Sequence, residues 1–524
     1  MPRYVLGVHS GHDASACLIR DNEIVYAIEK ERLTRKKHDF GEPLECIEYV
    51  LSAEGITYAD IDFVVRVNWY DSTELIDAYY NRFKKVIVRY EHHLFHAYAV
   101  SLMNQEEDML AYIVDGRGCR PIDNGEKGEA DVFEAESLYQ IHRNHIKSVL
   151  EEKRYAKHYS NRYCWGSHMD SLGYAYADLS RLIFQDYNAA GKIMALAAFG
   201  KENTKIPTAL IYNNNKFAVS SDWLEYLSGF KYPLSYHSEI AKDLAYRLQK
   251  EVEEYICFRI ETITRKYNCF NVGLSGGVAL NCKCNGVLIN KGIIDNMHLF
   301  PACGDNGIAV GAAVWAIREV FCDYNTISWQ YDMGKTYESI NQNDVVIDYV
   351  ADLLSEGKII GLYENGAEFG PRALCNRSII ASAKDANMRY ILNKHIKDRE
   401  LFRPFGGVVA ERNLSQLTEE KIASRYMLSA IHVKEDFIAQ IPSLVHEDKT
   451  LRVQIIDEND RNRTITKILN KMEEKYGEIV LINTSFNGKG EPIVETIDQA
   501  RSTARKIGLD YLLINGRGEK VREC

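Results

Sequence analysis

The sequence lacks the features that would place it in a membrane or outside the cell. It has no uninterrupted apolar run of the about 20 residues that a membrane-spanning helix requires. Its first residues, MPRYVLGVHSGHDAS, do not follow the basic, apolar and small-residue order of a secretory signal. Its 12 cysteines are scattered and include no CxxC pair, which argues against a disulfide framework and a zinc ribbon. We therefore predict a reduced, soluble, cytoplasmic protein with no membrane partner.

An excess of positive charge is absent as well. The chain has 64 lysines and arginines against 74 aspartates and glutamates, a net charge of −10. A protein that binds nucleic acid through its phosphates usually carries the opposite sign, so we predict no nucleic-acid partner. The composition is otherwise that of a globular protein, with 46% hydrophobic and 26% charged residues over 524 positions. At about 150 residues per domain, this length allows three or four structural units.

The polar stretch 323–345 has little apolar periodicity and is the best boundary in the chain. Before it, strand-like and helix-like segments follow one another, from an opening hairpin to a long helix over residues 238–267. After it, a helix and a strand in VVIDYVADLLSEGKIIGLYENG begin a second region. We find no internal repeat. The pattern predicts a mixed α/β protein with two main parts.

Four residues before the boundary are candidate metal ligands. His92 and His96 lie four residues apart in YEHHLFHAYAV, so a helix would turn both imidazoles to one face. Asp115 follows a predicted strand, and Asp305 lies in a glycine-flanked turn before a predicted helix. Each also has an ordinary structural explanation, as a solvated helix face, a turn former or an N-cap. Two imidazoles and two carboxylates together would suit Fe, Mn or Zn.

Three further motifs in the first region can contact a substrate. The Gly276-Gly277 turn of NVGLSGGVALN would let backbone approach a nucleotide, although it matches neither a Walker motif nor GxGxxG. It is equally explained as a tight strand–helix corner. Lys192 in AAGKIMALAAFG can neutralise a phosphate or lie solvated. His12 in GHDAS is either a catalytic base or the neighbour of an N-cap.

The second region concentrates basic side chains beside glycine and proline turns. Arginine forks match phosphate or carboxylate oxygens, and short polar side chains at a strand end suit a small amide-like or phosphate ligand. We predict an anion pocket there rather than scattered surface arginines. Its residues are Arg372, Lys397, Arg403, Arg452, Asn483 and Ser485.

These motifs, in this order, resemble those of the NodU/CmcH-type O-carbamoyltransferases. The resemblance extends from Val5 to about Leu513, and its most specific blocks are EFGPRALCNRSI and NTSFNGKGEPIV. It implies an N-terminal actin/hexokinase-like ATPase (ASKHA) domain over residues 1–335, similar to the tRNA threonylcarbamoyl-transfer protein. It also implies a YrdC-like α/β domain over residues 345–524.

The resemblance implies an ATP-dependent O-carbamoyltransferase. Such an enzyme makes a carbamoyl-adenylate from carbamoyl phosphate and ATP, then passes the carbamoyl group to a hydroxyl of a natural product or sugar. One divalent metal, Fe(II) or alternatively Mn or Zn, would be held near the nucleotide by His92, His96, Asp115 and Asp305, with Mg accompanying ATP. The oligomeric state stays open, with a homodimer as one option.

The resemblance also implies roles for the remaining residues. The nucleotide would be bound by Lys192, Gly276, Gly277, Val278 and Asn281. Carbamoyl phosphate would be bound by Arg372, Lys397, Arg403, Arg452, Asn483 and Ser485. His12 corresponds to a histidine close to the transferred carbamoyl group, and Lys37 of TRKKHD would face the second domain.

Two departures from the family pattern concern the substrates. The chain has FRPFGG where the family commonly has FRPFAP, and residues 117–140 lack the expected Gly/Trp/Ser/Thr-rich run near the acceptor entrance. Two other functions are considered. The net charge of −10 disfavours tRNA threonylcarbamoyladenosine-type modification, and the predicted ligand set disfavours a non-catalytic nucleotide-binding ASKHA module.

Overall fold

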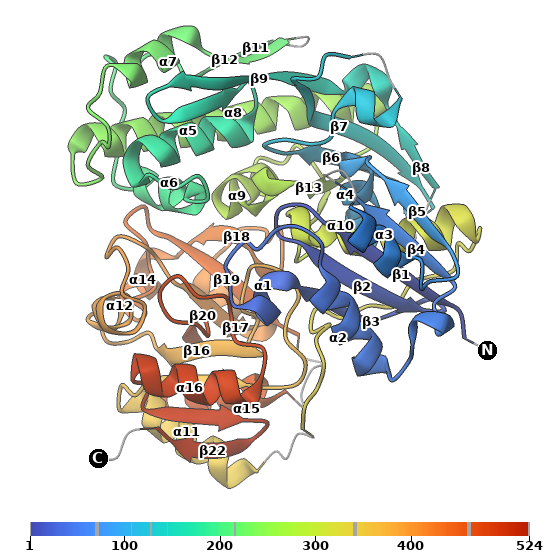
Figure 1. Cartoon of the computed structure of the whole chain (residues 1–524). Coiled ribbons are helices and arrows are strands. Elements are labelled where there is room, and N and C mark those ends of the chain that lie inside the picture. Colours follow the sequence, from blue (N-terminus) through green and yellow to red (C-terminus); the bar gives the residue numbers. More distant parts are fainter. Residues whose placement is uncertain are drawn as a thin grey trace. The chain divides into compact units, whose positions relative to one another are not determined.

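A computed structural model describes residues 2–68, 73–105, 107–125, 128–143, 145–213, 216–338, 343–457 and 463–521. The chain forms two compact units. The first comprises Met1–Arg66, Tyr70–Ile87 and Asn325–Cys524, and the second comprises Val67–Trp69 and Val88–Tyr324. Each unit combines strands and helices, which confirms the predicted mixed α/β class (Figure 1).

The N-terminal sheet has five strands in the order β3-β2-β1-β4-β5. They are β1 (Tyr4–His9), β2 (Ser15–Arg20), β3 (Glu23–Glu29), β4 (Phe63–Val67) and β5 (Val86–Arg89). β1 pairs antiparallel with β2, and β2 with β3, so the GHDAS motif forms the tight loop between the first two strands. Short α1 (Lys30–Thr34) follows β3, and α2 (Leu44–Glu54) packs its apolar face, including Ile47 and Val50, on the sheet.

The C-terminal part of the first unit is built on an eight-stranded sheet, ordered β18-β19-β17-β20-β16-β15-β21-β22. Its strands are β15 (Ile360–Tyr363), β16 (Arg377–Ser382), β17 (Gly406–Ala410), β18 (Tyr426–His432), β19 (Thr450–Ile456), β20 (Val480–Ser485), β21 (Tyr511–Ile514) and β22 (Arg517–Lys520). Successive residues of a strand face opposite sides. Accordingly, Ile380 packs with helices α11 (Asp344–Ser355) and α15 (Thr464–Tyr476), whereas Ile379 packs in the cluster that contains α16 (Ile497–Ile507).

The second unit contains a seven-stranded sheet with the path β10-β9-β7-β6-β13-β14 and β8 paired to β7. Its strands are β6 (Met109–Val114), β7 (Val132–His142), β8 (His145–Ser148), β9 (Arg154–Tyr163), β10 (Gly166–Met169), β13 (Asn271–Ser275) and β14 (Asn296–His298). Its principal helices are α4 (His92–Ser101), α5 (Leu172–Phe184), α6 (Ala190–Ala197), α8 (Glu239–Tyr267), α9 (Cys282–Asn290) and α10 (Ile308–Trp315).

The path β9-β7-β6-β13-β14 repeats the order of the N-terminal sheet. The strand in third position, β6, pairs antiparallel with β7 and parallel with β13, and β7 pairs antiparallel with β9. This is the strand order of the actin/hexokinase-like fold that the resemblance predicts. The duplication is visible in the topology although the sequence shows no internal repeat.

Several elements lie where the sequence pattern places them. The long helix α8 begins after Ser238, whose side chain accepts a hydrogen bond from the backbone N–H of Ala241. The polar segment 117–165, for which the sequence predicts no element, supplies β7, β8 and β9, and β10 follows it directly. The segment 202–240 contains β11 (Leu210–Asn213), β12 (Lys216–Val219) and α7 (Ser221–Ser228).

The predicted boundary is more complex than a simple linker. Ser328 accepts a backbone hydrogen bond from Ile24, and Met333 accepts one from Ala27, so this stretch runs along β3. The domain limits 1–335 and 345–524 therefore stay a prediction. Within the described ranges, no helix is both long and apolar enough to cross a membrane, and the described cysteines form no disulfide.

Candidate functional site

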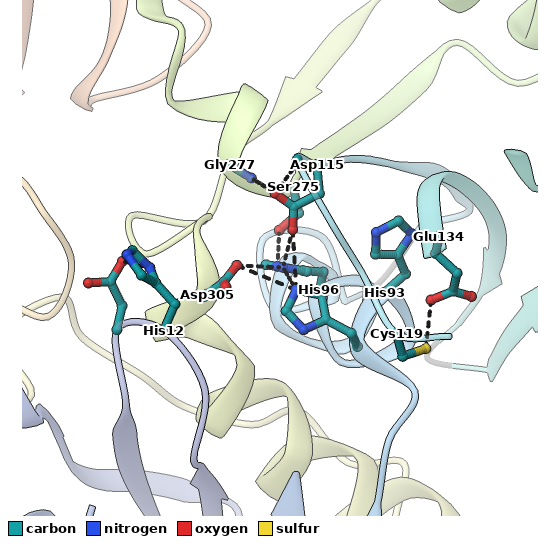
Figure 2. Close-up of polar contacts among 12 residues, drawn as sticks. His12, His93, His96, Asp115, Cys119, Glu134, Ser275, Gly277 and Asp305 are labelled. Atoms are coloured by element: carbon teal, nitrogen blue, oxygen red, sulfur yellow. Dashed lines mark hydrogen bonds and ion pairs between the residues drawn. The ribbon is translucent and has the colours of Figure 1, made fainter. Parts of the chain in front are cut away.

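The four predicted metal ligands come together in the second unit (Figure 2). His92 and His96 lie one turn apart on α4, and their Nε2 atoms are 3.3 Å from each other. Asp115 follows β6, and its Oδ2 lies 3.2 Å from the Nε2 of His92. Asp305 lies in the turn before α10, with its Oδ1 3.4 Å from His92 Nε2 and 3.6 Å from His96 Nε2. We call these four residues the histidine–aspartate cluster.

Glycines allow the backbone elements around this cluster to approach closely. An added Cβ at Gly311 of α10 would collide with the carbonyl oxygen of Phe95 in α4, and one at Gly276 would collide with that of Val114 in β6. Gly276 also has a positive φ of 93°. The backbone N–H of Gly277 donates to Asp115 Oδ1 at 3.1 Å, and that of Gly116 donates to the same oxygen at 2.7 Å. These two N–H donors thus fix Oδ1 of Asp115, and Oδ2 of the same carboxylate points toward the histidines.

Ser275 orients His96 from the other side. Its hydroxyl donates to the carbonyl of Cys303 at 3.1 Å and lies 3.2 Å from His96 Nδ1. Because the serine proton is used on Cys303, His96 must donate its Nδ1 proton, and the lone pair of its Nε2 then points into the cluster. A second partner of this kind typically fixes the tautomer of a metal-bound histidine. The sequence analysis did not identify Ser275.

The cluster fits a transition-metal ion. Its four ligand atoms lie within 4.8 Å of one another, and His92 and His96 are fully buried. Burial lowers the pKa of His92, but Asp305 and Asp115 outweigh burial and raise that pKa to about 10. The carboxylates thus favour positive charge at His92, and a metal cation would supply that charge in place of the proton. Two imidazole nitrogens and two carboxylate oxygens suit Fe, Mn or Zn.

His93 shows how specific this arrangement is. It is as buried as its two neighbouring histidines, but its Nδ1 contacts the Ser137 hydroxyl at 2.8 Å. Burial lowers its pKa to about 4, so it stays neutral beside Glu134. Position within the helix, not burial alone, decides which histidine joins the cluster.

The predicted nucleotide residues lie in the same unit, with different surroundings. Lys192 is on α6, and its ammonium lies 5.0 Å from the ring centre of Phe184. Asn281 is the N-cap of α9, since its Oδ1 accepts the N–H of Cys284 at 3.1 Å, and its amide donates to Tyr176 and Gln249. Val278 is buried. Their nucleotide-binding role stays a prediction.

The predicted anion residues come together in the first unit. Parallel pairing of β17 with β19 places Arg452 opposite Gly406, and antiparallel pairing with β20 places Asn483 opposite the same Gly406. Lys397 extends its Nζ to the carbonyl and hydroxyl oxygens of Ser485, and to the side-chain oxygen of Asn487 at 2.7 Å. Three strands and one lysine therefore converge. We call the six predicted residues the basic pocket: Arg372, Lys397, Arg403, Arg452, Asn483 and Ser485.

The FRPFGG departure falls inside the basic pocket. A Cβ added at Gly406 would collide with the sulfur of Met427, which lies beside it. The space that an alanine methyl group would need at position 406 is therefore occupied by the side chain of Met427. Arg399, which the sequence analysis missed, also lies there, donating to Asn393 Oδ1 at 2.7 Å and covering the Phe405 ring at 4.5 Å.

Cations of the basic pocket lie close enough together to lower the pKa of one another. Burial lowers the pKa of Lys397 well below its usual value, and the charges of Arg399, Lys37 and Arg403 lower it further. Burial, with Arg452, also lowers the pKa of Arg403, whose carboxylate neighbour Glu400 is 3.6 Å away. Lys37, predicted to face the second domain, has a pKa lowered by burial and by Arg403 and Arg372. That Lys37 faces the second domain stays a prediction.

The buried amide of Asn483 provides a further indication of a ligand. Its Nδ2 donates to Ala373 and Gln454, but its Oδ1 accepts no hydrogen bond from the described residues. A buried polar atom without a partner costs free energy unless a ligand or water supplies one. His12 lies elsewhere in the first unit, with its Nδ1 3.0 Å from Asp13.

Sequence comparison connects this geometry with a known family. The model described as the carbamoyltransferase N-terminus matches residues 4–80 and 72–314, and the model described as the carbamoyltransferase C-terminus matches residues 351–518. The chain belongs to the carbamoyltransferase family. This carbamoyltransferase has the histidine–aspartate cluster and His12 within the N-terminal match, and the basic-pocket residues within the C-terminal match.

Relatives of this carbamoyltransferase include proteins with named roles. It is 26% identical to nodulation protein NolNO of Sinorhizobium fredii, over 96% of this chain and 78% of that protein. It is also 26% identical to the 3'-hydroxymethylcephem-O-carbamoyltransferase of Amycolatopsis lactamdurans, over 62% of this chain and 64% of that enzyme. Among solved structures, HypF of T. kodakarensis is similar over 62% of this chain and 50% of that chain, at 14% identity and a TM-score of 0.41.

Proposed function

We propose that this carbamoyltransferase is an ATP-dependent O-carbamoyltransferase. Carbamoyl phosphate reacts with water to give carbamate and phosphate. The carbamate oxygen then attacks the α-phosphorus of ATP, pyrophosphate leaves, and a carbamoyl-adenylate forms. A hydroxyl of a small natural product or sugar takes the carbamoyl group, and AMP leaves. The mixed anhydride with AMP activates a carbamate that is otherwise a poor electrophile.

The observation that carries this proposal is the gathering of several basic side chains in the basic pocket, where, in addition to burial, Arg399 and Arg403 lower the pKa of Lys397 and Arg403 and Arg452 lower that of Arg399. Lys397 donates to oxygens of Ser485 and Asn487, which are neutral, and Glu400 lies 3.6 Å from Arg403. Such a site binds a small dianion and stabilises its departing phosphate. The open Oδ1 of Asn483 offers an acceptor for the carbamoyl amino group. A pocket for phosphate alone has no use for this amide oxygen.

The histidine–aspartate cluster supports the use of ATP in the second unit. His92, His96, Asp115 and Asp305 would hold one divalent ion, for which we propose Fe(II), with Mn or Zn as alternatives. When bound, that ion would supply Lewis-acid stabilisation of negative charge on a nucleotide or carbamoyl oxygen. Lys192 and the turn from Gly276 to Asn281 would bind the nucleotide phosphates, with Mg accompanying ATP.

His12 would take the proton of the acceptor hydroxyl. An imidazole has a pKa near neutrality and can accept a proton while the carbamoyl group is transferred. We propose that the N-terminal domain, residues 1–335, carries this transfer and the nucleotide site. The YrdC-like domain, residues 345–524, would bind carbamoyl phosphate, and the enzyme would act in the cytoplasm, where both substrates are made.

Pyrophosphate release tests the proposal. The purified chain should release pyrophosphate from ATP only when carbamoyl phosphate is present. Arg403→Ala should lower this rate by about 100-fold, because one charged donor to the departing phosphate is lost. Arg412→Ala, which removes a surface arginine paired with Glu473, is the matched control and should not change it. Release at the wild-type rate by Arg403→Ala would refute the assignment of the basic pocket.

A further inference from the structure

Two histidines of the first unit share one carboxylate. Asp13 accepts from His12 Nδ1 at 3.0 Å with one oxygen and from His38 Nδ1 at 2.8 Å with the other. The two rings are stacked, with centroids 5.1 Å apart and planes at 19°. His12 and Asp13 lie in the loop between β1 and β2, whereas His38 lies after α1. The trio thus joins two separate segments of the chain.

The backbone of both segments is fixed around this trio. Asp13 and His38 have positive φ angles of 54° and 55°, which non-glycine residues adopt only when their surroundings impose it. The N–H of His38 donates to Glu31 Oε2 at 2.8 Å, and that of Ala14 donates to the Asp39 carbonyl at 3.1 Å. The strain at Asp13 and His38 is therefore maintained by hydrogen bonds from both sides.

The segment that carries His38 also contacts the polypeptide that forms the basic pocket. Arg32 donates to the carbonyl of Gly370 at 2.7 Å, while Glu29 accepts the N–H of the same glycine at 2.7 Å. Gly370 lies two residues before Arg372. A single α1 segment therefore holds the peptide that leads to a pocket arginine.

Two further side chains of this segment reach the same region. Arg35 donates to the carbonyls of Pro492 and Ile493 at 2.7 and 2.6 Å, at the end of the loop that contains Asn487. Lys37, next to His38, has its pKa lowered by burial and then by Arg403 and Arg372 of the basic pocket. Residues 29–38 consequently contact Gly370, Pro492 and Ile493 through Glu29, Arg32 and Arg35, and contact Asp13 through His38.

We propose that His38 is a positioning residue for His12. By sharing Asp13 and stacking on the ring, His38 holds His12 as the tautomer that carries its proton on Nδ1, so that Nε2 is the proton-accepting nitrogen. Because Arg32 and Arg35 of the same segment hold the peptides at Gly370 and Ile493, which flank basic-pocket residues along the chain, anion binding in the basic pocket alters the His12–Asp13–His38 trio. This inference rests on the proposed role of His12 in accepting the acceptor proton. The logic is that of a carboxylate that fixes the tautomer of a catalytic histidine.

The other titratable groups around the trio are Glu31 and Lys37 on the α1 segment, Asp39 after it, and His9 on β1. The ring of His9 contacts the carbonyl of His12 at 3.1 Å. Asp13 lies against both imidazoles of the trio, with one carboxylate oxygen 3.0 Å from His12 Nδ1 and the other 2.8 Å from His38 Nδ1. The shared carboxylate is therefore the direct connection between His12 and His38.

Nitrogen NMR of the full chain labelled with ¹⁵N-histidine tests the proposal without any substrate. Wild-type His12, assigned with His12→Gln, should show the Nδ1-protonated tautomer, and inorganic phosphate should shift the resonances of His12 and His38. The phosphate-induced shift should disappear in Lys37→Gln. A wild-type His12 that is protonated on Nε2, or resonances that phosphate leaves unchanged, would overturn the proposal.

Kinetics of two variants supply the second measurement. With carbamoyl phosphate, ATP and water as the acceptor, AMP release should fall by about 10-fold in His38→Ala and its pH profile should shift, while pyrophosphate release in the first turnover is unchanged. His38→Asn keeps an N–H donor for Asp13 and should restore most of the rate. His432→Ala removes a surface histidine paired with Glu420 and is the matched control.

Failure of this inference differs from failure of the proposed function. Wild-type protein without any carbamoyl-phosphate-dependent pyrophosphate release would refute the proposed function and leave the NMR result to decide the tautomer. Normal pyrophosphate release, with AMP release in His38→Ala equal to wild type and an unchanged His12 tautomer, would refute the positioning role alone. Equal impairment in His38→Asn and His38→Ala would also refute it, because the donor to Asp13 would then have no effect.

Discussion

The histidine–aspartate cluster and the basic pocket both gather ionisable side chains, but the charges in the two sites are arranged in opposite ways. In the cluster, Asp115 and Asp305 face His92 and His96 at 3.2 to 3.6 Å, so opposite charges compensate one another before any ligand binds. In the basic pocket, cations lower the pKa of one another, and most of their partners are neutral oxygens. In the cluster, attraction between opposite charges stabilises the site without a ligand. In the basic pocket, the fold holds like charges together against their repulsion, and a bound anion would reduce that repulsion.

The two sites also differ in what holds them. The cluster depends on backbone approaches at glycines and on two N–H donors to Asp115. The basic pocket depends on strand register, since Arg452 and Asn483 both lie opposite Gly406. A substitution of a ligand should therefore affect the cluster locally, while the pocket should respond to any change in its total charge.

The largest effect should come from breaking the cluster. Asp305→Asn removes one of the two carboxylates and should weaken binding of Fe(II), Mn(II) or Zn(II) by more than about 100-fold. This is a larger loss than is usual when a residue that only hydrogen-bonds a metal ligand is removed. Metal content by mass spectrometry and titration calorimetry measure this. Ser275→Ala, which removes only the hydroxyl beside His96 Nδ1, should cost about 10-fold and serves as the graded control. One tightly bound equivalent in Asp305→Asn would contradict the ligand set.

The sequence predicts the cluster well because its members are set by short-range patterns. The spacing of His92 and His96 is that of one helical turn, and Asp115 and Asp305 mark the end of a strand and the start of a helix. The same spacing turns His93 to another face of the helix. What it does not predict is the partner of His93 there, because Ser137 lies 44 positions further along the chain and such long-range contacts leave no local pattern.

The basic pocket was predictable as a set of residues but not in its chemistry. Its members were proposed from arginine-rich motifs and the family resemblance, and β17, β19 and β20 do bring several of them together. The pattern could not show that Lys397 would be buried against neutral oxygens, nor that Arg399 would join it. Likewise, the repeated strand order of the two sheets emerges only from the pairing, because sequence similarity between the halves is not needed to preserve a topology.

The protonation of Lys397 provides a second test of the difference between the two sites. Its native pKa lies well below the usual 10.5, because of burial and then Arg399, Lys37 and Arg403. An unfolded lysine therefore binds more protons than the native one between these two pKa values, so this group makes unfolding less favourable as pH rises through that window. A bound phosphate dianion reverses the repulsion and raises the pKa of Lys397.

Phosphate binding should accordingly take up a proton at pH values above the native pKa of Lys397. Titration calorimetry in buffers of different ionisation enthalpy measures this uptake, which should approach one proton and disappear in Lys397→Met. Arg399 and Arg403 also have lowered pKa values through burial, yet guanidinium groups stay charged and contribute no uptake. Binding without proton uptake at any pH would show that Lys397 is charged before the anion arrives.

The smallest effect concerns stability without a ligand, where the two sites should respond with opposite signs. Arg403→Gln removes one cation from the basic pocket and loses only the contact with Glu400 at 3.6 Å, so the phosphate-free protein should gain about 1 kcal/mol. Arg412→Gln, at a surface pair with Glu473, should change stability by less than about 0.5 kcal/mol. Urea unfolding of the three proteins measures these differences. A loss of stability in Arg403→Gln would mean that the arginine is held by favourable contacts, and that the pocket, like the cluster, is balanced before its ligand binds.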